Sequence, residues 1–269
     1  MIDRHWPEGL KNKAFYSLGV MDMRYFFIEP AALLKPTVAI DGSEVRHMKK
    51  VLRLRPGDPI RLFDGEGFEY EAVIRRFVAD RVELNIGQKF PGTREPSVQI
   101  AVAQALLKEK KMDRLLRHLC ELGLTHWIPF TSERSIPKPG EKRMPARMQR
   151  WNKIIKESAK QCRRARLPEI NRTLAFEEVL DSEGSWNLKV VFYENESASL
   201  NSIILQAGPQ HPQKILMIMG PEGGFSDPEI AKARAAGCLV AGLGPRILRA
   251  ETATIAAITL IQCLFGDMG

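Results

Sequence analysis

The sequence lacks the signals of a membrane or exported protein. No apolar run approaches the length of a bilayer span, and the N-terminus has no apolar core followed by a cleavage site. The four cysteines lie far apart, and neither they nor the five histidines show metal-ligand spacing. We therefore expect no metal site and buried thiols in the reducing environment of the cytoplasm.

Several binding motifs are also missing. The glycine-rich loops match neither GxxxxGK[ST] nor GxGxxG, which argues against a nucleoside triphosphate or a dinucleotide as ligand. The chain has no helix-turn-helix, zinc-finger or basic-zipper pattern, which argues against a reader of duplex DNA. It also has no internal repeat and no low-complexity segment.

What the sequence has in excess is positive charge. Its 269 residues include 40 Lys and Arg against 32 Asp and Glu, a net charge of +8. This excess favours a polyanionic partner, with nucleic acid first and an anionic membrane surface second. A merely basic soluble enzyme remains the alternative.

The positive charge gathers in two places. Residues 133–172 hold thirteen Lys or Arg against four Glu, and they include Arg163, Arg164 and Arg166. A second cluster, Arg46–Arg55, contains five Lys or Arg and no acid. A solvated basic face would explain either cluster alone, but two clusters favour a surface that follows phosphates. A structured RNA fits better than duplex DNA.

Three segments are expected along the chain. Residues 1–22 show no periodicity, so we interpret them as an extension and expect the functional chain to start near Met23. Residues 23–93 alternate short strands with tight turns, which is typical of a small β-barrel. Residues 94–269 alternate apolar strands with longer helices, which predicts an α/β domain with a mainly parallel sheet.

Two glycine loops lie near the C-terminus of the α/β segment. The expected strand Ile215–Met219 stops at Gly220–Gly224, and the strand Leu239–Leu243 ends in Gly242–Pro245. Between them, Ser226 and Glu229 have the spacing of a capping box. Ligands bind at the carboxyl ends of such strands, so the loops predict a small-molecule site, unless both are only tight turns.

The two loop motifs carry a family resemblance. Leu243–Ala253, taken with Gly220–Ser226, closely resembles the 16S ribosomal RNA (uracil-N3)-methyltransferases of the knotted SPOUT superfamily. The resemblance covers most of residues 23–269 and none of residues 1–22. It also includes His47 with Val51–Asp58, Lys108, Glu121–Gly123, Glu133–Ser135, Gln161–Arg164 and Pro168–Ile170.

The resemblance implies a fold, a cofactor and an oligomeric state. The first domain would be a PUA-like barrel that helps bind RNA, and the second an α/β domain with a deep trefoil knot. S-adenosylmethionine would be held by three loops, and the protein would be a homodimer, with Thr252–Phe265 as knot helix and part of the interface. The implied cofactor-binding residues are Glu194, Gly220, Pro221, Glu222, Gly223, Leu243, Gly244, Ile247 and Leu248.

It also implies catalytic and RNA-binding residues. Uracil N3 becomes a good nucleophile only after losing its proton. Arg249 could stabilise the resulting anion, while Glu251 could take the proton, orient Arg249, or merely interact with a helix dipole. The expected contacts to 16S ribosomal RNA or the small ribosomal subunit are Arg24, His47, Arg53, Arg55, Arg163, Arg164 and Arg246.

Two other functions stay open. A knotted methyltransferase could act on a ribose 2′-hydroxyl or on transfer RNA, although the match in the first domain argues against this. The chain could also be a non-catalytic RNA-binding factor for ribosome assembly that has kept the fold.

Overall fold

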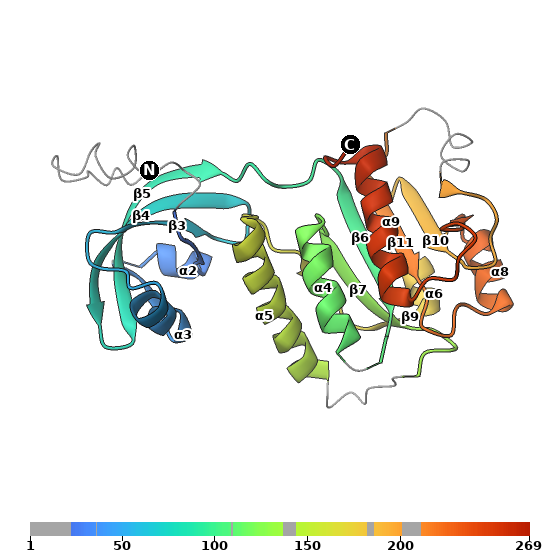
Figure 1. Ribbon diagram of the computed structural model, residues 1–269, viewed down its shortest axis with the longest axis horizontal. Coiled ribbons are helices and arrows are strands. Elements are labelled where there is room, and N and C mark those ends of the chain that lie inside the picture. Colours follow the sequence, from blue (N-terminus) through green and yellow to red (C-terminus); the bar gives the residue numbers. More distant parts are fainter. Residues whose placement is uncertain (1–22, 36, 109, 137–143, 182–185, 201–210) are drawn as a thin grey trace. The chain divides into compact units, whose positions relative to one another are not determined.

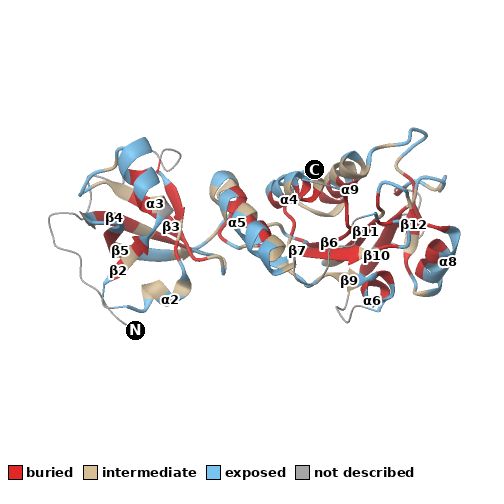
Figure 2. Cartoon of the chain, turned by 90° about the horizontal axis from the view of Figure 1, so that it is seen from below, coloured by how far each residue is buried: buried red, intermediate tan, exposed pale blue. Residues whose placement is uncertain are grey.

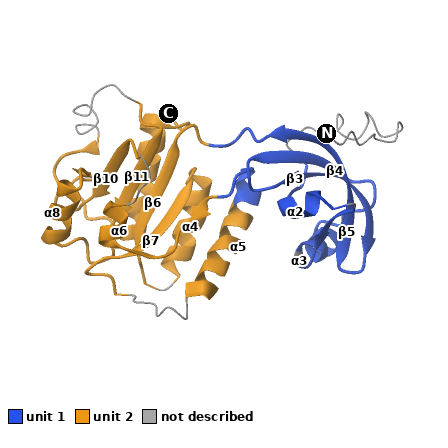
Figure 3. Ribbon diagram, turned by 180° about the vertical axis from the view of Figure 1, so that it is seen from behind, with its two compact units in different colours: residues 1–95, 159–167 blue, residues 96–158, 168–269 orange. Residues whose placement is uncertain are grey.

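The computed structural model describes residues 23–35, 37–108, 110–136, 144–181, 186–200 and 211–269 (Figure 1). The chain divides into two compact units (Figure 3). Unit 1 comprises residues 1–95 and 159–167, and unit 2 comprises residues 96–158 and 168–269. The expected extension, residues 1–22, lies outside the described residues.

Unit 1 is built on a five-stranded sheet with the order β1-β3-β4-β5-β2. Strand β1 runs parallel to β3, and the other neighbours are antiparallel. The strands are β1 (Tyr25–Phe27), β2 (Val38–Asp41), β3 (Pro59–Phe63), β4 (Phe68–Val78) and β5 (Arg81–Pro91). The helical elements are α2 (Pro30–Leu33), α3 (Ser43–Arg46) and the π-helical η2 (His47–Val51).

The period-2 alternation of these strands buries one face of the sheet in the unit's core. Ile60 and Leu62 of β3 lie beside Ala72 and Ile74 of β4, and Met48 of η2 packs on the same cluster. In the described part of the chain, the edge strands β1 and β2 do not pair with each other. The sheet is therefore curled into a half-barrel, and the expected small barrel domain ahead of the α/β domain is confirmed.

Unit 2 contains a seven-stranded sheet in which every pairing is parallel. Its main order is β12-β10-β11-β6-β7-β8, and β9 pairs with β7. The strands are β6 (Gln99–Ala105), β7 (His126–Thr131), β8 (Glu169–Ile170), β9 (Leu174–Ala175), β10 (Leu188–Phe192), β11 (Lys214–Met219) and β12 (Leu239–Ala241).

Helices cover both faces of this sheet. Figure 2 shows α4 (Lys111–Glu121) and α9 (Ala250–Phe265) on one face, and α6 (Phe176–Leu180) and α8 (Asp227–Ala235) on the other. Because both faces are covered, the central strands are apolar runs rather than alternating ones.

Helix α5 (Met144–Cys162) begins in unit 2, and its residues from Ala159 on belong to unit 1. The expected α/β fold with a mainly parallel sheet is confirmed.

The last helix differs from the expectation. We expected an apolar, buried helix over Thr252–Phe265, whereas α9 starts at Ala250 and buries only one face. Thr254, Ala257 and Ile258 are buried, but Leu260 on the other face is 43% exposed. In the single chain, an apolar stripe of α9 therefore remains uncovered.

Candidate functional site

The first loop of the site follows β11 and is fixed by a buried amide. Gln104, at the end of β6, is fully buried and donates from Nε2 to the carbonyl of Gly220 at 3.0 Å. Its Oε1 accepts a hydrogen bond from the Thr254 hydroxyl at 2.7 Å. A single side chain thus connects the Gly220–Gly224 loop to α9.

The far end of this loop is held by a second set of contacts. The Arg134 guanidinium donates to the carbonyls of Gly223 at 3.1 Å and Phe225 at 3.3 Å. Ser226 then caps α8, and its side chain and that of Glu229 form the reciprocal pair expected from the sequence. The loop is therefore anchored at both ends before any ligand binds.

The loop after β10 lies close against this glycine loop. Gly224 has a φ of +67°, and a Cβ built there would lie 1.9 Å from Oε1 of Glu194. Only glycine combines this backbone conformation with so close an approach. At the end of β12, a Cβ on Gly242 would lie 2.1 Å from the carbonyl oxygen of Glu196. The glycines therefore let the three loops meet.

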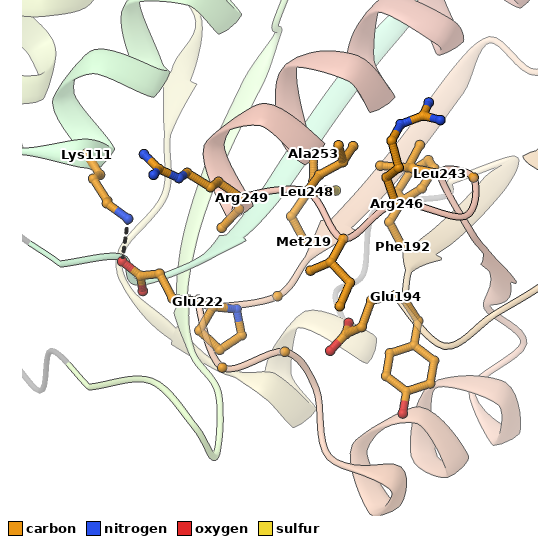
Figure 4. A pocket seen from close by; sticks show the side chains of 18 residues that line it. Lys111, Phe192, Glu194, Met219, Glu222, Leu243, Arg246, Leu248, Arg249 and Ala253 are labelled. Atoms are coloured by element: carbon orange, nitrogen blue, oxygen red, sulfur yellow. Dashed lines mark ion pairs between the residues drawn. The ribbon is translucent and has the colours of Figure 1, made fainter.

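Between the loops is a cavity of about 500 Å³, within the usual size range of small-molecule sites (Figure 4). Phe192, Met219 and Leu248 provide apolar surface, and the glycines expose backbone polar groups. Five charged side chains also line it: Lys111, Glu194, Glu222, Arg246 and Arg249. The cavity can thus receive a ligand with an apolar ring and charged ends.

The structure brings the sequence-predicted pocket residues together. All of the expected cofactor-binding positions line this one cavity: Glu194, Gly220, Pro221, Glu222, Gly223, Leu243, Gly244, Ile247 and Leu248. Arg246 and Arg249 line it as well. Glu251 is not among the lining residues, but its carboxylate lies 3.4 Å from Nζ of Lys111, which lines the pocket.

Among the charged residues that line the pocket, Lys111 is the one that the sequence did not indicate. Its Nζ lies 3.2 Å from Oε1 of Glu222 and 3.4 Å from Oε1 of Glu251. Burial alone would lower the pKa of Lys111, but the two carboxylates outweigh burial and raise it. Burial alone would raise the pKa of Glu222, but the Lys108 N–H and the Lys111 ammonium lower it. The ammonium and the Glu222 carboxylate therefore both stay charged at neutral pH.

The residues expected to contact RNA fall into different environments. Arg24, His47, Arg53 and Arg55 are exposed on unit 1, and Arg246 is exposed beside the pocket. Arg163 is partly buried and has a φ of +62°.

Arg164 requires a correction. It is only 3% exposed, and its Nη2 lies 3.0 Å from the Glu95 carboxylate. The same carboxylate accepts the N–H groups of Ala165 and Arg166 at 2.8 Å each. This geometry makes Arg164 part of the interior of unit 1 and argues against the expected RNA contact. A run of arginines in the sequence does not show which of them folds inward.

The burial of the four cysteines agrees only in part with the expectation. Cys120 and Cys238 are buried as expected, whereas Cys162 is partly buried and Cys263 is exposed. The described ranges contain no cluster of three metal-ligating side chains. Within those ranges, none of the helices combines the length and apolarity needed to cross a bilayer.

Comparisons with known proteins identify both units. Residues 93–262 match the model of an RNA methyltransferase domain, and residues 40–76 match that of an RNA methyltransferase PUA domain. The chain is 32% identical over 231 residues to the ribosomal RNA small subunit methyltransferase E of Bacillus subtilis, covering 84% of this chain and 90% of the relative.

Two solved structures are similar over nearly their whole length. One is the ribosomal RNA small subunit methyltransferase E of Neisseria gonorrhoeae bound to S-adenosyl methionine, with a TM-score of 0.80, 31% identity and coverage of 92% of this chain and 100% of that one. The other is a methyltransferase from Legionella pneumophila in complex with the bound cofactor SAM, with a TM-score of 0.80, 30% identity and coverage of 91% and 99%.

Proposed function

The chain belongs to the RNA methyltransferase family that includes ribosomal RNA small subunit methyltransferase E, and we propose that it methylates N3 of a uridine in 16S ribosomal RNA. S-adenosylmethionine is the proposed methyl donor. The observation that carries the proposal is the cavity at the ends of β10, β11 and β12, which gathers every position expected to bind this donor. Relatives with the same fold were solved with the donor bound.

The residues of the cavity fit this ligand. Phe192, Met219 and Leu248 offer the apolar surface that an adenine ring requires, and loop amides and carbonyls offer partners for its polar edge. The carboxylates of Glu194 and Glu222 suit the cationic remainder of the donor. Bound S-adenosylmethionine supplies an electrophilic methyl group, so the protein mainly has to align the uracil and exclude water.

The remaining task is to deal with the proton on N3. Methylation forms an N3–C bond, breaks the donor's S–C bond and releases the N3 proton to a base. We assign to Arg249, at the start of α9, the stabilisation of the anionic uracil through its oxygens. Glu251 follows it in the first turn of α9 and either accepts the proton or orients Arg249.

RNA binding is assigned to basic residues of both units, which are exposed except for the partly buried Arg163. Arg24, His47, Arg53 and Arg55 would contact RNA from the domain of residues 23–93, which includes the PUA match. Arg163 and Arg246 would hold phosphates near the target uridine, which has to leave its stack to react. The domain of residues 94–269 would carry the transfer chemistry. A ribosomal RNA substrate places this activity in the cytoplasm.

We further propose that the protein acts as a homodimer through α9, in the trefoil-knot part of the domain. The support is the uncovered apolar stripe of α9, because a self-complementary helix face is a common twofold interface. A partner chain would cover this stripe and bring additional residues to the pocket's surroundings.

Mapping the methyl group tests the function. Purified protein, S-adenosylmethionine and either naked 16S ribosomal RNA or small ribosomal subunits are incubated, and the digested RNA is analysed by mass spectrometry. We expect N3-methyluridine at one position. A methyl group on ribose, or transfer only to transfer RNA, would establish the alternative methyltransferase. No binding of S-adenosylmethionine at millimolar concentration would instead indicate a non-catalytic assembly factor.

A further inference from the structure

Lys111 joins three elements at the edge of the pocket. It is the first residue of α4, and its ammonium lies between Glu222 of the glycine loop and Glu251 of α9. Figure 4 shows the ion pair between Lys111 and Glu222 at the rim of the cavity. The three side chains are about one quarter to one third exposed, so solvent screens this network only in part.

The two carboxylates depend on Lys111 to different degrees. Glu222 also accepts the backbone N–H of Lys108 at 3.1 Å, and its loop is held by Gln104 and Arg134. Glu251 has no such support. Its Oε2 is buried without a hydrogen-bond partner in the described part of the chain, and its ionic contact there is with Lys111. Removing the Lys111 ammonium would therefore disturb mainly the position of the Glu251 carboxylate.

The charges of the network point to the same residue. One ammonium faces two carboxylates, so one negative charge is left over. Lys111 contacts Oε1 of Glu251, whereas Oε2 is buried without a donor among the described residues. Lys111 thus holds the carboxylate through one oxygen and leaves the other available as an acceptor.

We propose that Lys111 is a positioning residue for methyl transfer, which holds the Glu251 carboxylate in place while leaving cofactor binding to other contacts. The proposal rests on the proposed function, because it concerns the step in which the N3 proton is lost. It holds whether Glu251 accepts that proton or orients Arg249, because both roles need the carboxylate in one fixed place.

Replacing the ammonium by an apolar side chain of similar length tests the proposal. We expect Lys111→Met to lower the single-turnover rate of methyl transfer about 30- to 100-fold, the usual effect of losing a residue that orients a reacting group. Its dissociation constant for S-adenosylmethionine, measured by calorimetry, should change by less than about threefold, because the Lys108 N–H still holds Glu222.

Two further variants separate position from charge. Lys110→Met is the matched control, because Lys110 is exposed at the N-cap of α4 and its side chain makes no hydrogen bond or ion pair with the described residues. It should transfer methyl groups at the wild-type rate. Lys111→Arg keeps a cation that can reach both carboxylates and should restore a part of the rate. Full activity of Lys111→Met would overturn the proposal.

A double-mutant cycle identifies the carboxylate through which Lys111 acts. In a Glu251→Gln background, adding Lys111→Met should cost little further rate, whereas in a Glu222→Gln background it should cost nearly its full effect. The opposite pattern, or a parallel loss of rate and cofactor affinity, would place Lys111 in cofactor binding and refute the proposal. If wild type and Lys110→Met also fail to methylate RNA, it is the proposed function that fails.

Discussion

The side chain of Arg249 makes no hydrogen bond or ion pair with the described residues that would stabilise the fold. It occupies the N-cap position of α9, but its side chain makes no capping hydrogen bond, and the residue is exposed. Its guanidinium nevertheless lines the pocket (Figure 4). An exposed arginine that the fold does not use, placed at a binding cavity, is best explained by a ligand.

Arg249→Ala should therefore impair methyl transfer and leave stability and cofactor binding nearly unchanged. We expect turnover to fall about 100- to 1000-fold, the usual cost of removing one donor to a developing anion. The melting temperature should stay unchanged, and cofactor affinity should change by no more than a few-fold. Steady-state kinetics and calorimetry on the same preparation check this. Unchanged turnover would remove Arg249 from the proposed mechanism.

Gly224 allows a second, sharply controlled prediction. An alanine there would bring its Cβ to 1.9 Å from the Glu194 carboxylate, so Glu194 would have to leave its place at the pocket. We expect Gly224→Ala to weaken S-adenosylmethionine binding by at least about tenfold, which corresponds to roughly 1.4 kcal/mol. Binding calorimetry measures it.

The control is Gly237→Ala. Gly237 also has a positive φ, +76°, but nothing lies within 4 Å of its Cβ position. Both substitutions should cost about 1 kcal/mol of stability through the backbone conformation, and only Gly224→Ala should affect the ligand. Equal affinities of the two variants for S-adenosylmethionine would show that Glu194 does not contribute to cofactor binding.

At single residues, the sequence predicts what local chemistry determines. The glycine loops and the Ser226 cap are visible because their signals lie within a few neighbouring positions. Lys111 is not visible, because its partners Glu222 and Glu251 come from distant segments that only the sheet order brings together. Glu194 was expected from the resemblance, and its contact with Gly224 emerges only in three dimensions.

At the scale of elements, the segment after α5 is a structural part of unit 1. Arg163 leaves the helix with a left-handed backbone, and Ala165 then lies close to Gly92 and hydrogen-bonds through its carbonyl to the Gly67 N–H at 3.2 Å. Arg164 turns inward to Glu95. A segment that the sequence suggested as an RNA surface thus includes an interior ion pair.

Arg164→Met should consequently act on stability rather than on RNA. Removing one partner of a buried pair leaves the other charge uncompensated, which costs about 3 kcal/mol. We expect a lower midpoint in urea unfolding and an unchanged salt dependence of RNA binding by the folded protein. For Arg163→Met we expect a change in RNA binding instead. The slope of the logarithm of the binding constant against the logarithm of the salt concentration should become less steep by about 0.7 to 0.9, the contribution of one phosphate contact. A less steep salt dependence in Arg164→Met would show that Arg164 does contact RNA.

Element boundaries were predictable where turn residues mark them. The turn residues Asp64–Gly67 predict the hairpin loop that separates β3 from β4 in the structure. The sequence predicts one helix over Ser43–Leu52, whereas the structure passes from α3 into the wider turns of η2, a change that apolar spacing does not indicate. It also predicts a helix over Trp151–Cys162, whereas α5 already starts at Met144.

At the scale of the whole molecule, the net charge indicates the kind of partner but does not show which surface binds it. Part of the basic segment 133–172 is used for internal contacts rather than offered to RNA. Arg134 binds loop carbonyls, and four other cations of the segment pair with carboxylates: Arg150 with Asp113, Lys160 with Glu44, Arg164 with Glu95 and Arg172 with Glu178. Pairing of this kind depends on tertiary structure, so a count of charges overstates the free basic surface.

The uncovered face of α9 makes the assembly testable. Leu260 is 43% exposed on a helix whose other face is fully packed, and its neighbours one turn away, Ala256 and Leu264, are only partly buried. If a second copy covers this face, burying a carboxylate there would be prohibitive. Leu260→Asp should therefore convert the protein to monomers and lower methyl transfer, because the dimer is proposed to complete the site.

Analytical ultracentrifugation at micromolar concentration measures the mass, which should be twice the 30.4 kDa of one chain for wild type and 30.4 kDa for Leu260→Asp. Leu34→Asp serves as the matched control, since Leu34 is 86% exposed in unit 1 and the same change there should leave the dimer intact. A wild-type protein that sediments as a monomer would refute the dimer outright. A Leu260→Asp variant that stays dimeric would move the interface away from α9, because a charge in the centre of a packed apolar contact has no low-cost position.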